Sequence, residues 1–149
     1  MLFGQDRNKL RQFYCDTWAA RRQGLPLEPL QLQIAEVIEQ HPEYQPLVEH
    51  PDQALARDYL PELGETNPFL HMGMHLAIRE QLATDRPAGM RESYQRLLMT
   101  TGDRHQLEHQ CMDCLAEMIW NAQKQGIEPD EKAYMTCIQS LLDADPHTR

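Results

Sequence analysis

Two pairs of histidines have the residue types and the spacing that suit metal binding. The pairs are His71 with His75 and His105 with His109, and they account for four of the seven histidines in the chain. Residues four apart stack on one face of a helix, one turn from each other. Neutral imidazoles bind zinc, iron or manganese, and a carboxylate such as Glu108 suits the same ions. The two pairs and Glu108 therefore predict a site for a single transition-metal ion.

Helix phase predicts which of these side chains point into the protein. At about 100° per residue, His71 and His75 fall opposite the polar side of a helix that is otherwise almost entirely apolar. In the second pair, Glu108 falls in the middle of an apolar face, and the two histidines lie on its flank. A buried carboxylate is costly unless it has a partner or takes up a proton. Arg79, one turn beyond His75, is an alternative partner that would make a metal unnecessary there.

Two functions are compatible with these residues. In the first, the chain binds a metal through the histidine pairs, with Glu108 as a ligand or a general base. Any catalysis would then be metal-dependent hydrolytic or oxidative chemistry through activated water. In the second, the chain is a non-enzymatic module that binds a protein partner or self-associates. The histidines and Glu108 would then form a buried polar network. The segment from His105 to His109 matches the HxxEH pattern of inverted zinc peptidases, but no sheet and no obvious third ligand accompany it.

Composition excludes several classes of partner. The 149 residues carry a formal charge of −9, so we expect no basic surface that would bind nucleic acid and no basic helix face that would bind an anionic membrane. No apolar run approaches the roughly 20 residues that span a bilayer, and the N-terminus has no signal-peptide pattern. We therefore expect a cytoplasmic location, in which all four cysteines are reduced thiols. Cys111 and Cys114 form a CxxC pattern, which we interpret as buried core cysteines because no second pair exists.

Apolar periodicity predicts an all-α fold, an irregular bundle of about five or six helices in a single domain over residues 1–149. Residues 42–68 are expected to be an irregular, proline-rich connection with one or two helical turns around residues 53–59. Residues 145–149 are expected to be a frayed tail. The main helices are expected at residues 6–23, 28–41, 67–84, 85–102, 103–125 and from 129 onward.

Cap signals and apolar stripes support these boundaries. Asn67 followed by Pro68 is typical of a helix start, and Asp85 resembles an N-cap. Gly126 is typical of the residue just after a helix. The stripe of the first helix is expected to bury five residues: Leu10, Phe13, Tyr14, Trp18 and Ala19.

The chain also resembles a small bacterial family that is known only as a domain of unknown function, family 1841. The resemblance rests on the stretch from Asn67 to Leu76, on Asp85-Arg-Pro, and on Gly102-Asp103 followed by His105, Glu108 and His109. It extends to residues 6–18, 25–29, 114–115 and 120–123, so it covers nearly the whole chain. The family pattern includes both histidine pairs and Glu108, but not Cys111. The resemblance implies no activity, because no function is established for the family.

Overall fold

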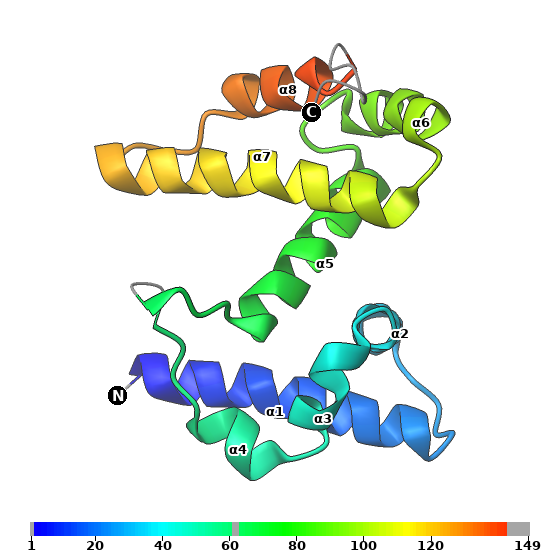
Figure 1. The fold of residues 1–149 in the computed structure, drawn as a ribbon, viewed down its shortest axis with the longest axis vertical. Helices are drawn as coiled ribbons and strands as arrows, with labels where there is room; N and C mark the ends of the chain where they lie inside the picture. Colours follow the sequence, from blue (N-terminus) through cyan, green and yellow to red (C-terminus); the bar gives the residue numbers. More distant parts are fainter. Residues whose placement is uncertain (1, 61–62, 143–149) are drawn as a thin grey trace. The chain divides into compact units, whose positions relative to one another are not determined.

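The computed structural model describes residues 2–60 and 63–142, and the regular elements in these ranges are all helical (Figure 1). The predicted all-α class is therefore confirmed, and the predicted tail at 145–149 lies outside the described residues. Within these ranges six α-helices have ten residues or more and two shorter ones fall in the proline-rich connection, so the predicted count of five or six helices is slightly low. In chain order the elements are α1 (Leu2–Arg22), α2 (Pro29–Glu39), the 3₁₀ turn η1 (Pro42–Tyr44), α3 (Gln45–Val48), α4 (Pro51–Ala56), α5 (Pro68–Thr84), α6 (Met90–Thr101), α7 (Arg104–Gln125) and α8 (Glu131–Ser140).

The chain divides into two compact units, Met1–Leu76 and Ala77–Arg149, and α5 runs across the boundary. The expectation of one domain over residues 1–149 stays a prediction. In the first unit, α1 packs against α2, α3 and α4. None of the helices in the described part of the chain is long and apolar enough to cross a membrane. The core of the first unit consists of Tyr14, Cys15, Trp18, Ile34, Val37, Ile38, Val48, Ala54, Phe69 and Met72.

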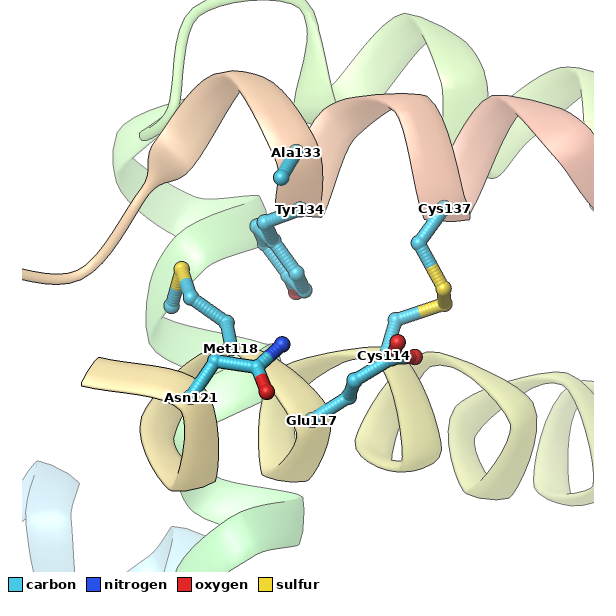
Figure 2. A pocket seen from close by; sticks show the side chains of 7 residues that line it. All are labelled: Cys114, Glu117, Met118, Asn121, Ala133, Tyr134 and Cys137. Atoms are coloured by element: carbon cyan, nitrogen blue, oxygen red, sulfur yellow. A yellow bond between two sulfur atoms is a disulfide. The ribbon is translucent and has the colours of Figure 1, made fainter. Parts of the chain in front are cut away.

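In the second unit, α6, α7 and α8 pack against one another, and α8 runs back alongside α7. A disulfide joins Cys114 on α7 to Cys137 on α8 (Figure 2), while Cys15 and Cys111 are free and buried. The expectation that all four cysteines are free thiols is therefore wrong. The packing of the two helices brings the Cα atoms to 5.8 Å, within the range that a disulfide requires. This pairing depends on tertiary packing and has no local signal in the sequence.

The start of α5 and the end of α7 agree with the cap residues that the sequence predicted, Asn67 and Gly126. The side chain of Asn67 accepts hydrogen bonds from the backbone N–H groups of Phe69 and Leu70 and begins α5. Helix α7 begins after Asp103, whose carboxylate accepts from the backbone N–H of Gln106, and it ends at Gly126 with a positive φ of 66°.

The start of α6 differs from the prediction. The helix begins at Met90, five residues later than expected, because Asp85 has a φ of 52° and lies outside the helix. Asp85 still caps the helix, since its Oδ1 accepts a hydrogen bond of 2.9 Å from the backbone N–H of Arg91. The N-cap position itself is occupied by Gly89, so the expectation that Asp85 is the N-cap residue is wrong.

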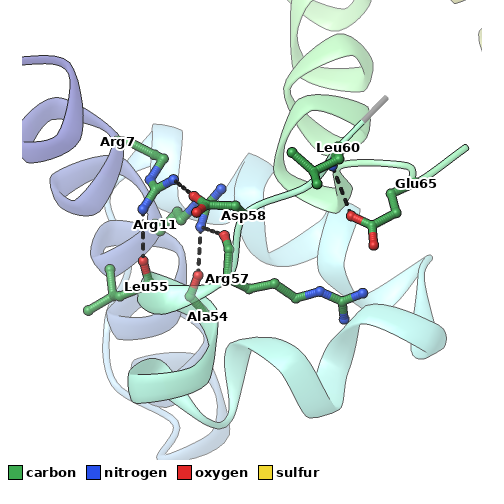
Figure 3. A network of polar contacts seen from close by, with 8 residues as sticks. All are labelled: Arg7, Arg11, Ala54, Leu55, Arg57, Asp58, Leu60 and Glu65. Carbon is green, nitrogen blue, oxygen red and sulfur yellow. Dashed lines mark hydrogen bonds and ion pairs between the residues drawn. The ribbon is translucent and has the colours of Figure 1, made fainter. Parts of the chain in front are cut away.

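The buried stripe of α1 contains an arginine that the sequence prediction missed. Leu10 and Ala19 are exposed, contrary to expectation, whereas Arg11 is only 2% exposed. The Arg11 guanidinium donates hydrogen bonds to the carbonyl oxygens of Ala54 at 2.8 Å and Arg57 at 2.6 Å (Figure 3). It also lies over the ring of Phe69, 5.0 Å from its centroid. Arg11 therefore ties α1 to the end of α4 through groups that are shielded from water.

We expect Arg11→Met to lower the free energy of unfolding by about 2–4 kcal/mol, because two carbonyl groups lose a charged donor. Urea denaturation followed by the fluorescence of Trp18, which is buried in the first unit, measures this effect. The matched control is Arg21→Met on the same helix. Arg21 pairs with Glu39 near the surface, with side chains 38% and 43% exposed, so its loss should cost at most about 1 kcal/mol. Equal losses in the two variants would contradict the role assigned to Arg11.

Candidate metal centre

Three histidines of the first unit lie together, and one of them, His41, was not among the predicted ligands. His41 lies two residues after the last residue of α2, Glu39, and is only 2% exposed. It continues the buried stripe of this helix, since it stands four residues after Val37 and three after Ile38, both fully buried. The helix phase of α2 was therefore the signal that could have identified His41 as an inward-facing residue.

The predicted pair His71 and His75 faces inward from α5, as expected. His75 is fully buried and His71 is half-buried. Their Nε2 atoms lie 3.2 Å apart, and their ring centroids lie 4.8 Å apart. The cap at Asn67 fixes the start of α5, so the first two turns of the helix carry both rings to the same side.

The three imidazoles are close enough to serve one ion. The ring of His41 lies 4.7 Å from the ring of His75 and 5.2 Å from that of His71, measured between centroids. One ring nitrogen from each histidine lies within 4.8 Å of the others, so the group could hold a metal ion. Two nitrogens on one tetrahedral zinc, each about 2.0–2.1 Å from it, stand about 3.3 Å apart. The separation of 3.2 Å between the Nε2 atoms of His71 and His75 matches this value.

The hydrogen bond of His41 determines which of its nitrogens can bind a metal. Nδ1 lies 2.7 Å from the carbonyl oxygen of Val37. A carbonyl oxygen only accepts, so Nδ1 carries the proton and the lone pair lies on Nε2. Metal-binding histidines commonly donate their second ring N–H to a carbonyl in this way. Tyr44 stacks on the same ring, with centroids 5.3 Å apart and planes within 6° of parallel, and this contact holds the ring in place.

The second predicted pair lies on α7, in the other unit. His105 is exposed and His109 is half-buried, and their ring centroids are 4.3 Å apart. Glu108 is buried at 4% exposure, as its position in the apolar face predicted. Arg79 pairs with it, with Nε 3.2 Å from Oε1 and 3.5 Å from Oε2. Arg79, which we considered in the sequence as an alternative partner for Glu108, therefore does pair with it.

Burial raises the pKa of two side chains whose titration is also affected by the charge of Glu108, Tyr94 and Cys111. Burial raises the pKa of the Tyr94 hydroxyl to about 12, and the charge of Glu108 adds to this effect. Burial also raises the pKa of the Cys111 thiol to about 12, again with a smaller contribution from Glu108. Both groups are protonated at neutral pH, so Cys111 is not a nucleophile there. This agrees with its interpretation as a core cysteine.

A family model described as a domain of unknown function, DUF1841, matches residues 6–140. The chain belongs to the DUF1841 family. The match confirms the resemblance seen in the sequence, and it includes both histidine pairs, Glu108 and His41. No curated protein and no solved structure matches the chain. Membership in DUF1841 therefore identifies the relatives of this chain but assigns it no activity.

We expect Arg79→Met to lower the free energy of unfolding by about 3 kcal/mol, because it breaks the ion pair that Arg79 forms with the buried Glu108 carboxylate. The double variant with Glu108→Leu should recover part of this loss, since it removes the buried charge as well. Thermal unfolding followed by circular dichroism measures both effects. Additive losses in the double variant would contradict the coupling between Arg79 and Glu108.

Proposed function

We propose that this DUF1841 protein binds one transition-metal ion through His41, His71 and His75. The observation that carries the proposal is the geometry of the three rings. Two Nε2 atoms stand 3.2 Å apart, and the third ring is fixed by a carbonyl so that its own Nε2 carries a lone pair. A set of neutral imidazoles favours borderline ions, so zinc is the first candidate and iron or manganese the alternatives.

Burial supports a specific site rather than a chance cluster of surface histidines. His41 and His75 are 2% and 0% exposed, so their positions are set by the core around them. His71 and His75 also lie on a helix, α5, and ligands on helices hold a metal geometry more rigidly than ligands on loops. His71 is half-buried and forms the accessible side of the group. A small molecule could reach an ion from this side, while Tyr44 covers His41.

A bound ion of this kind supplies a Lewis acid and can lower the pKa of a water ligand. Within the chain, the Val37 carbonyl orients His41, and Tyr44 restricts the movement of its ring. The role predicted for Glu108, as a ligand or a general base, stays a prediction. Its ion pair with Arg79 favours the alternative interpretation for this residue, a buried polar network that stabilises the second unit.

We expect the purified chain without a histidine tag to contain about one metal ion, measured by elemental mass spectrometry after expression in metal-replete medium. His41→Ala and His75→Ala should each lower the affinity by at least about tenfold, as is usual for groups that hold a metal. The matched control is His50→Ala, because His50 is an exposed histidine of the same unit, and it should bind like the parent. A parent chain with no stoichiometric metal would contradict the proposal.

The second histidine pair is tested by the same measurement. The sequence predicts that His105, His109 and Glu108 contribute ligands, so His109→Ala and Glu108→Gln should also weaken binding. Metal content unchanged in both variants would assign these residues to the structural network instead. Circular dichroism of each variant shows whether it is folded, and only folded variants enter the comparison.

A further inference from the structure

The disulfide between α7 and α8 lies at a cavity that no proposed function uses. We propose that this disulfide is a site of thiol–disulfide exchange, at which small thiols form a mixed disulfide with Cys137. We further propose that Glu117 makes the site favour cationic thiols over anionic ones. The inference is independent of metal binding, because all of the residues involved belong to α7 and α8 of the second unit.

The cavity gives an attacking thiol access to the disulfide. It has a volume of about 50 Å³, and both cysteines line it (Figure 2). Part of the wall is formed by three exposed residues, Glu117, Asn121 and Ala133, so the cavity opens to solvent. A volume of this size admits a few water-sized groups, enough for a sulfur atom and its neighbouring carbon but not for a protein loop. The reactant is therefore a low-molecular-weight thiol.

The two sulfur atoms differ in burial, which selects the point of attack. Cys114 is 3% exposed, whereas Cys137 is half-buried. Exchange requires direct approach to a disulfide sulfur, so its rate depends on access as well as on the attacking thiolate. Attack at Cys137 leaves the more buried sulfur, that of Cys114, as the leaving group. Cys111 lies one turn before Cys114, but its thiol stays protonated at neutral pH and does not compete.

The exchange proceeds in two steps. In the first, a thiolate attacks Sγ of Cys137 and forms a new S–S bond, while the bond between Cys137 and Cys114 breaks. The electron pair of the broken bond passes to Sγ of Cys114, which takes up a proton from water. In the second step, another thiolate attacks the sulfur of the bound small thiol; the electron pair of the broken S–S bond passes to Sγ of Cys137, which takes up a proton from water. The small thiols are oxidised to their own disulfide, and the protein disulfide is reduced to two thiols.

Glu117 places a carboxylate in the wall of the cavity, one turn after Cys114 on α7 (Figure 2). A negative charge in the wall repels an anionic thiol that enters the cavity and attracts a cationic one. The side chain is exposed, so the effect is moderate and decreases with added salt. We expect a factor of about two to five in relative rate at low ionic strength.

The test uses the full oxidised chain and three probes: cysteamine, 2-mercaptoethanol and 2-mercaptoethanesulfonate, at equal thiolate concentration. Acid-quenched samples are analysed by intact mass and by peptide mapping. The expected result is a mixed disulfide at Cys137, formed fastest with the cationic thiol and slowest with the anionic one. An adduct at Cys114, exchange only after denaturation, or free Cys114 and Cys137 in the chain purified without reductant would overturn the proposal.

Two charge-matched variants test the role of Glu117. Glu117→Gln should reduce the ratio of cationic to anionic rates by about two- to fivefold. Glu128→Gln removes the same charge from the exposed turn between α7 and α8, outside the cavity, and should leave the ratio near that of the parent. If both variants change the ratio equally, the preference reflects the net charge of the chain, and the assignment to Glu117 is wrong.

Discussion

A polar side chain that is shielded from water must find a partner of matching chemistry, because an unmatched one destabilises the fold by several kcal/mol. Both units of this protein contain buried polar groups that are matched in this way. Arg11 is matched by backbone carbonyls, His41 by the carbonyl of Val37, and Glu108 by Arg79. The contacts of Arg11 and Glu108 each connect two segments of the fold, whereas His41 bonds to the helix that it follows, α2. The polar contacts therefore select one arrangement of helices among the many that could bury the same apolar residues.

The helices were predictable because their signals are local. Asn67 and Gly126 act within one turn of the residues that they cap, and the apolar period of α5 and α7 is long enough to show the buried face. The helical turns expected around residues 53–59 correspond to α4, which spans Pro51–Ala56, but α3 was not predicted, because a helix of four residues carries too little periodicity. Leu10 was expected inside and Arg11 was not predicted to be buried, since the apolar pattern of a helix cannot show that two carbonyl groups of another segment will accept hydrogen bonds from an arginine.

The candidate site was predicted in part for the same reason. His71 and His75 share a helix, so their spacing revealed them, and their inward direction is confirmed. His41 lies beyond the last residue of α2, before a proline, and joins them only through the tertiary fold. The disulfide is the clearest case of a feature set by packing: its cysteines are 23 residues apart in sequence, on two helices.

The disulfide also changes what a break in the backbone would do. The turn between α7 and α8 is exposed, and Lys124 and Lys132 on either side of it are exposed as well. All of these residues lie between Cys114 and Cys137, so a protease that cuts there severs the peptide chain without releasing either fragment. The two pieces remain one covalent molecule until a reductant acts. Degradation of this hairpin therefore takes two separate chemical events, one hydrolytic and one reductive.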